Sequence, residues 1–226
     1  LPAGFPTVEG SKKLFDAVLS GTGDKPGGDI VEVGVPFSDP VMDGPTIQRA
    51  SETALRAGFR LRDTFDVVSS IADSGRAAVV MTYWNPVHRY GLEAFARDLK
   101  AAGGLGVITP DLIPDEADEW IEATDKHGLD RIFLVAPSST EERLALTTRA
   151  SSGFVYATSV MGVTGARDQV GEAAAKLVQR TRAHTDLPIC VDGVISGSAF
   201  VARAEEQGPD GVAELAAELG SGVRSR

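Results

Sequence analysis

The chain contains the stretch Asp29-Ile-Val-Glu-Val-Gly-Val35, directly followed by Pro36-Phe-Ser-Asp-Pro-Val-Met-Asp-Gly-Pro45. The first stretch has the β-branched composition of a buried strand. Successive side chains of a strand point to opposite faces, so Glu32 shares a face with Ile30 and Gly34 while the valines share the other. Glu32 therefore points where a core residue is expected. Loss of hydration there raises the pKa of a carboxyl group toward the range of a general acid or base.

A second carboxylate, Asp43, follows eleven residues later in a loop that Pro36, Pro40 and Pro45 stiffen. Each acid alone has a structural explanation, because Glu32 could pair with an arginine and Asp43 could cap the helix that begins near Pro45. Two acids on one rigid segment together favour a catalytic pair.

The composition limits the class of protein. The chain has 226 residues, 42% of them hydrophobic, and a formal net charge of −10, which suits one domain over residues 1–226. No dense Lys/Arg cluster is present, so a nucleic-acid or anionic-membrane surface is not expected. No lysine ends an apolar strand, which argues against a Schiff-base mechanism.

Cysteine, histidine and targeting signals give mostly negative information. Cys190 is the one cysteine, and its apolar neighbours predict a buried, inert thiol. The three histidines show no metal-ligand spacing, so no metal is expected. The sequence shows no membrane-spanning stretch and no signal peptide, and we expect a cytoplasmic protein.

Short β-branched runs alternate with helical segments, which is typical of βα units around a parallel sheet. The predicted strands are 1–3, 29–35, 77–82, 105–109, 131–136, 153–158, 187–191 and 193–196. The predicted helices are 11–20, 45–58, 62–75, 91–102, 115–127, 140–150, 169–184 and 210–223. Eight strands in an α/β chain predict a (β/α)8 TIM barrel, whose active site lies at the carboxyl ends of the strands.

Two places depart from a regular barrel. The chain opens inside the first predicted strand, so we expect that N-terminal residues are missing. The strand ending at Val191 also runs directly into the strand that begins after Asp192, although parallel neighbours need a crossover of about a dozen residues. We therefore expect a missing segment of roughly fifteen to twenty residues between Val191 and Asp192.

Three further segments are candidates for the site. Ile195-Ser-Gly-Ser-Ala199 ends a strand and opens a helix, so backbone N–H groups near Gly197 and Ser198 could bind an anion, although an ordinary turn fits as well. The loop Met161-Gly-Val-Thr-Gly-Ala-Arg167 could be a lid or a passive connection. Tyr156 alone would be explained by core packing.

The segment from Glu32 to Gln48 closely resembles the signature of the tryptophan synthase alpha subunit family. Matching pieces follow in order: Met81-Thr-Tyr-Trp-Asn-Pro86, Pro110-Asp-Leu112, Tyr156, the loop Met161–Arg167 and Ile195-Ser-Gly-Ser-Ala-Phe200. The resemblance covers nearly the whole chain, apart from a glycine turn after the seventh strand.

The resemblance implies cleavage of indole-3-glycerol phosphate to indole and glyceraldehyde 3-phosphate, with Glu32 and Asp43 as the catalytic residues. It implies substrate contacts from Tyr83, Tyr156, Thr164, Met81, Ile108 and Leu134, and phosphate contacts from Gly165, Gly197 and Ser198. We expect burial to raise the pKa of Glu32 and a polar loop to keep Asp43 ionised.

The resemblance also implies no cofactor in this chain and a pyridoxal-phosphate beta subunit as partner in an α2β2 complex, which receives the indole by channelling. A stand-alone indole-3-glycerol phosphate lyase, a regulatory barrel that only activates the beta subunit, and another phosphate-binding barrel such as a sugar-phosphate isomerase stay open as alternatives.

Overall fold

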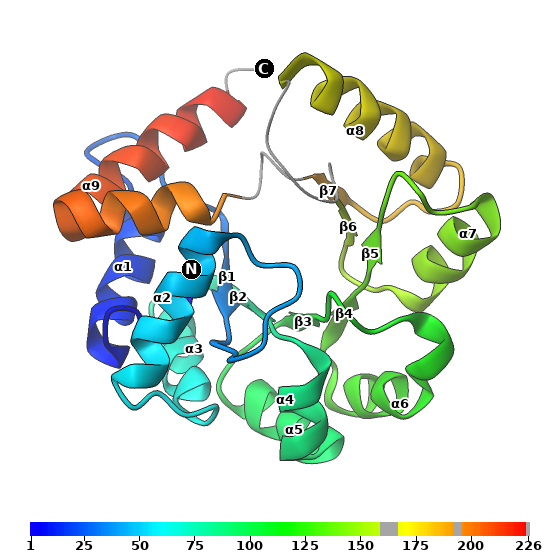
Figure 1. The fold of residues 1–226 in the computed structure, drawn as a ribbon, viewed down its shortest axis with the longest axis horizontal. Helices are drawn as coiled ribbons and strands as arrows, with labels where there is room; N and C mark the ends of the chain where they lie inside the picture. Colours follow the sequence, from blue (N-terminus) through cyan, green and yellow to red (C-terminus); the bar gives the residue numbers. More distant parts are fainter. Residues whose placement is uncertain (159–166, 192–195, 225–226) are drawn as a thin grey trace.

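A computed structural model describes residues 1–158, 167–191 and 196–224. Its strands are β1 (Ile30–Gly34), β2 (Ala77–Met81), β3 (Gly106–Ile108), β4 (Asp130–Ile132), β5 (Leu134–Val135), β6 (Val155–Ala157) and β7 (Ile189–Val191). They form two parallel sheets, β1-β2-β3-β4 and β5-β6-β7. Figure 1 shows the strands around the centre of the molecule and the helices outside them.

The helices follow the strands in the alternation of a (β/α)8 barrel, which confirms the predicted fold. They are α1 (Val8–Ser20), α2 (Pro45–Arg56), α3 (Asp63–Asp73), α4 (Trp84–Tyr90), α5 (Leu92–Ala101), the 3-10 turn η1 (Pro114–Glu116), α6 (Asp118–His127), α7 (Glu141–Ala150), α8 (Arg167–Arg182) and α9 (Ser198–Arg224). Threonine side chains cap two of them: Thr7 accepts the N–H of Gly10 at α1, and Thr140 accepts that of Arg143 at α7.

One predicted strand, 131–136, is wrong in detail, because the structure divides it into β4 and β5 with Phe133 between them. The first part pairs with β3 and the second part pairs with β6. The segment therefore changes its pairing partner and links the two sheets. Phe133 itself is buried, and its carbonyl accepts the N–H of Tyr156.

The two ends of the strand series differ from the middle. Pro2 forms an isolated parallel bridge with Gly34 of β1, in agreement with the strand predicted at 1–3. The junction after Val191 and most of the strand predicted at 193–196 fall on residues 192–195, which lie outside the described residues. Of that predicted strand, Ser196 alone is described.

Two helical segments were not predicted. Helix α4 has no counterpart among the predicted helices, although Pro86 fits it, because a proline in the first turn of a helix removes no helical hydrogen bond. The carboxylate of Asp111 accepts the N–H of Trp84 at the start of α4 (2.8 Å). Helix α9 begins at Ser198, twelve residues before the predicted start. Gly208, with φ of 63°, breaks it directly before Pro209.

The hydrophobic core has an outer and an inner part. The outer part lies between the strands and the helices and includes Val33, Phe15, Leu99 and Trp120, each at most 1% exposed. A small inner cluster lies inside the barrel and consists of Val79, Ile108, Ile132 and Tyr156, with Met81, Leu134 and Phe154 packed against it. Most of the buried apolar surface is therefore on the outside of the sheets.

Within the described ranges, no helix is long and apolar enough to cross a membrane.

The core assignment predicts that two leucines, one buried and one exposed, contribute unequally to the free energy of unfolding. Leu99→Ala removes a fully buried side chain and should lower the free energy of unfolding by about 2–5 kcal/mol. Leu105→Ala, at a side chain that is 46% exposed, is the matched control and should change it by about 0.5 kcal/mol or less. Urea denaturation of both variants measures the difference, and equal effects would contradict the assignment.

Candidate active site

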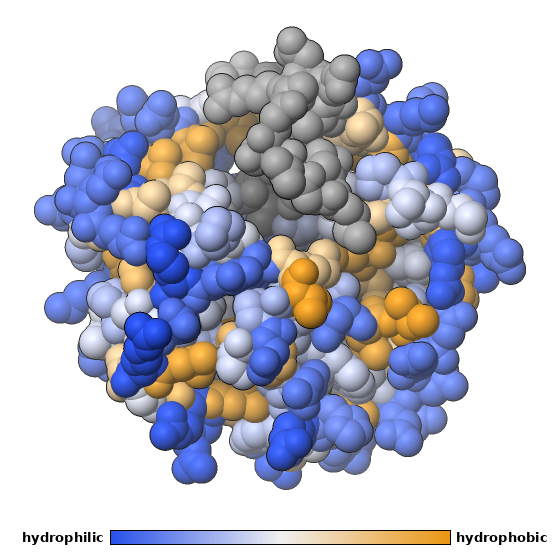
Figure 2. Space-filling view, viewed as in Figure 1, coloured by the Kyte–Doolittle hydropathy of each residue, from blue (hydrophilic) through white to orange (hydrophobic). Residues whose placement is uncertain are grey.

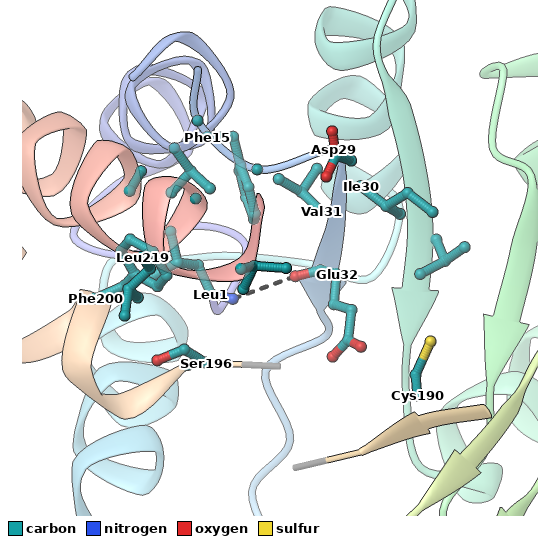
Figure 3. A pocket seen from close by; sticks show the side chains of 18 of the residues that line it. Leu1, Phe15, Asp29, Ile30, Val31, Glu32, Cys190, Ser196, Phe200 and Leu219 are labelled. Carbon is teal, nitrogen blue, oxygen red and sulfur yellow. Dashed lines mark hydrogen bonds between the residues drawn. The ribbon is translucent and has the colours of Figure 1, made fainter. Parts of the chain in front are cut away.

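Glu32 lies in the middle of β1, and its side chain faces the inside of the barrel. Its strand neighbours Val31 and Val33 are buried in the outer core, whereas Glu32 is half-buried. The pairing with β2 sets Glu32 beside Val79 of the inner cluster. Figure 3 shows the carboxylate pointing into a cavity, while the amino group of Leu1 donates to the backbone carbonyl of Glu32 (3.2 Å). The predicted inward orientation of Glu32 is thus confirmed.

The cavity has a volume of about 350 Å³ and lies along β1, where residues of α1 and α9 line it together with the barrel residues Val79 and Phe154. At the carboxyl end it is bounded by Ser196 and Gly197, and at the amino end by Gly28 and Asp29. Its walls between these ends are largely apolar and include Val79, Phe154, Phe200 and Leu219. A carboxylate in this apolar surrounding can exchange protons with a bound molecule away from bulk water.

Cys190 differs from its prediction as a buried thiol. It is half-buried and lines the same cavity across from Glu32 (Figure 3). Burial, with the Glu32 carboxylate as a second cause, raises the pKa of the Cys190 thiol. The thiol is thus held in its protonated, weakly nucleophilic form, as the prediction of an inert cysteine requires.

Asp43 lies in the loop between β1 and α2, and it does not cap the helix. The N-cap of α2 is Gly44, and no side-chain hydrogen bond caps this helix end. The Asp43 carboxylate instead accepts a hydrogen bond from the hydroxyl of Tyr83 (3.2 Å). Its backbone carbonyl accepts one from the side-chain amide of Gln48 (2.8 Å). The capping explanation that the sequence left open for Asp43 is therefore wrong.

The electrostatic surroundings of Asp43 are also less polar than the sequence suggested. The carboxylate is half-buried, and this desolvation raises its pKa above the usual 3.8, while the hydrogen bond from Tyr83 acts in the opposite direction. Among the described residues, no ion pair of Asp43 with a lysine, arginine or histidine is present. The polar partner of the Asp43 carboxylate is therefore the Tyr83 hydroxyl.

The predicted substrate walls divide into two groups. Ile108 and Tyr156 belong to the inner cluster, and Met81 and Leu134 pack against it, so the barrel interior brings these four together. Tyr83 does not belong to that cluster. It is buried and follows β2, where its ring contacts Phe37 with a centroid distance of 5.3 Å.

The predicted phosphate residues are described in part. Ser198 is the first residue of α9 and is exposed, and Gly197 precedes it at the edge of the cavity. The backbone N–H groups of a first helical turn have no helical acceptor, so this end of α9 can bind an anion. Thr164 and Gly165 lie outside the described residues. Within the described part of the chain, no cluster of His, Cys, Asp and Glu could hold a metal ion.

One structural contact near the site had no signal in the sequence. In the sequence Asp111 is only part of the matching piece Pro110-Asp-Leu112, yet in the structure it joins its loop to the start of α4 by accepting the N–H of Trp84. Neither residue type nor spacing indicates such a bond across 27 residues.

Comparisons with known proteins agree along the whole chain. A family model described as tryptophan synthase alpha chain matches residues 1–216. The tryptophan synthase alpha chain of Nocardia farcinica is 58% identical over 242 residues, covering 100% of this chain and 89% of the relative. That of Mycobacterium avium is 56% identical over 243 residues, covering 100% and 88%.

The alignment with the Nocardia farcinica relative has 242 positions, whereas this chain has 226 residues. At about 16 internal positions the relative therefore has a residue and this chain has a gap. Solved structures match the chain as well. Tryptophan synthase from Mycobacterium tuberculosis has a TM-score of 0.88 and 53% identity, covering 99% of this chain and 90% of that one. The tryptophan synthase α2β2 complex of Pyrococcus furiosus has a TM-score of 0.86 and 31% identity, covering 100% and 96%. With its fold, its inward-facing glutamate and its full-length relatives in agreement, the chain belongs to the tryptophan synthase alpha chain family.

Proposed function

We propose that Glu32 and Asp43 are the two catalytic carboxylates with which this chain performs the family's alpha reaction. In this reaction indole-3-glycerol phosphate is cleaved to indole and glyceraldehyde 3-phosphate. The observation that carries the proposal is the Glu32 carboxylate, which faces the barrel interior and lines the cavity along β1. No acid at that place is needed for packing, because the other face of β1 supplies the outer core.

The reaction requires two proton transfers beside the scissile carbon–carbon bond. C3 of the indole ring must accept a proton so that the ring can take up the bonding electrons, and the neighbouring side-chain hydroxyl must lose its proton to become the aldehyde. Glu32 would shuttle these protons. The apolar walls around it limit exchange with water, which favours a group that gains and loses a proton in one cycle.

Asp43 would act on the other side of the indole. Protonation at C3 places positive charge on the ring N–H, and a carboxylate hydrogen-bonded there stabilises this charge more in the transition state than in the substrate. Asp43 must be ionised for this role. Its desolvation opposes ionisation, and the Tyr83 hydroxyl supports it.

The remaining contacts would come from the ends of the strands. Ile108, Met81, Leu134 and Tyr156 would hold the apolar indole ring, and Gly197 with Ser198 would hold the phosphate at the start of α9. In this proposal Thr164 would close over the substrate as part of the lid loop, and Gly165 would provide a further phosphate contact.

The partner in this proposal is a tryptophan synthase beta subunit that carries pyridoxal phosphate. The two chains would form an α2β2 complex, the assembly named for the Pyrococcus furiosus relative. The loop with Asp43 also presents apolar side chains to the outside, because Val41 is 77% exposed and Met42 is 44% exposed. Exposed apolar side chains beside a polar site are typical of a protein interface. We place the beta subunit at this loop.

The direct test of the proposed function is indole release from indole-3-glycerol phosphate, measured with and without a tryptophan synthase beta subunit. Weak release alone that rises with the partner is expected for a coupled alpha subunit. Strong release alone would favour a stand-alone lyase. Release in neither case, with activation of the beta subunit, would leave only a regulatory role.

Glu32→Gln removes the proton-transferring group while keeping its size. We expect turnover to fall by about a thousandfold or more, since general acid–base catalysis contributes about 10²–10⁴-fold. Asp29→Asn is the matched control, because Asp29 lines the same cavity at its other end and its side chain is 83% exposed. Steady-state indole release should be near normal in the control. Near-normal release from Glu32→Gln would remove Glu32 from the mechanism.

Asp43→Asn separates catalysis from stability. Turnover should fall by about a hundredfold or more, as for the loss of other transition-state charge partners. Stability should behave differently, because a raised pKa means that the charged carboxylate destabilises the folded state at neutral pH. The variant should thus unfold at an equal or higher temperature than the parent chain near pH 7.

The stability advantage of Asp43→Asn should shrink as the pH falls through the raised pKa of the folded state and vanish below 3.8, where the parent carboxyl is protonated in both states. Thermal denaturation followed by circular dichroism across this range measures it. A variant that is less stable near pH 7 and as active as the parent would restore a purely structural role for Asp43.

A further inference from the structure

Tyr83 contacts the loop that carries Asp43 at three points. Its ring packs against Phe37, with 5.3 Å between the centroids and an angle of 35° between the planes. Its hydroxyl accepts the backbone N–H of Met42 (2.9 Å) and meets the Asp43 carboxylate (3.2 Å). The contacts bridge about 40 residues of chain, so they dock the loop onto the end of β2.

The two hydrogen bonds define where the hydroxyl proton lies. A backbone N–H can only donate, so the Met42 bond uses a lone pair of the Tyr83 oxygen. The single proton of the hydroxyl is then available to the Asp43 carboxylate, which in its ionised form can only accept. The arrangement is therefore a hydrogen-bonded relay from Met42 N–H through the Tyr83 hydroxyl to Asp43, and it suits the ionised carboxylate.

Tyr83 is itself held firmly. It is 5% exposed and forms the N-cap position of α4 with an extended backbone. The next residue, Trp84, is fixed by the bond from its N–H to the Asp111 carboxylate. The loops after β1, β2 and β3 are thus joined in sequence through Asp43, Tyr83 with Trp84, and Asp111.

We propose that Tyr83 is a positioning residue of the alpha reaction, whose hydroxyl holds Asp43 charged and oriented toward the substrate. This inference rests on the proposed catalytic role of Asp43. Within the part of the chain that the structure describes, Tyr83 is the titratable side chain that contacts the Asp43 carboxylate. A hydrogen bond to an ionised acceptor is about twice as strong as a neutral one, which makes this hydroxyl more than a packing contact.

Tyr83→Phe tests the inference, because it removes the hydroxyl and keeps the ring against Phe37. We expect kcat for indole release to fall by about tenfold or more, with a smaller change in KM, since the substrate walls lie elsewhere. The acid limb of the kcat pH profile should also move to higher pH, because the bond that lowers the pKa of Asp43 is gone.

Tyr90→Phe is the matched control. The Tyr90 hydroxyl donates to the Asp98 carboxylate (2.7 Å), so the variant also breaks a tyrosine–aspartate bond, but between α4 and α5 on the outside of the barrel. Its kcat and pH profile should match those of the parent chain. Circular dichroism of both variants should show the parent fold.

The double variant Tyr83→Phe with Asp43→Asn shows whether Tyr83 acts through Asp43. If it does, removing the hydroxyl in the Asp43→Asn background should change kcat by about twofold or less. Two outcomes would overturn the inference but not the proposed role of Asp43. One is the same tenfold loss of kcat in both backgrounds, and the other is an unchanged kcat and pH profile in Tyr83→Phe while Asp43→Asn is impaired. Normal turnover of Asp43→Asn would overturn the proposed role of Asp43 and the inference with it.

Discussion

The parallel pairing of β1 with β2 is the constraint on which the rest of the structure depends. Its register sets Glu32 beside Val79 and Gly34 beside Met81. A slip of one residue would turn Glu32 toward the helices and Val33 toward the cavity. A carboxylate at the fully buried position of Val33 would lose its hydration without a partner, which costs several kcal/mol. The outer core and the inward carboxylate are thus fixed by one register.

Stability and the proposed chemistry use different faces of the same strands. The outer core holds the large buried side chains, including Trp120, Phe15 and Phe95. The inner cluster is small, and a cavity of about 350 Å³ continues beside it along β1. Because the outer face supplies most of the apolar burial, the inner face can carry a half-buried acid and open space without loss of the main core.

Local patterns explain what the sequence could predict. The alternation in β1 predicted the direction of Glu32, and Pro45 predicted the start of α2. Patterns of one segment cannot show how distant segments meet. The division of 131–136 between two partners, the carboxylate of Asp111 at the start of α4 and the hydroxyl of Tyr83 on Asp43 all depend on contacts between separate loops. For the same reason Asp43 could not be distinguished from a helix cap by sequence.

The two carboxylates are supported by opposite means. Glu32 is carried by a strand whose backbone bonds and buried neighbours set its direction. Asp43 is carried by a loop, and prolines limit the loop backbone without orienting the carboxylate. The orientation comes from one hydroxyl, which also offsets part of the cost of burying the charge. In the proposed mechanism, the site combines a proton-transfer group held by a strand with a charge partner that one hydroxyl holds in place before charge develops, which is the preorganisation that transition-state stabilisation requires.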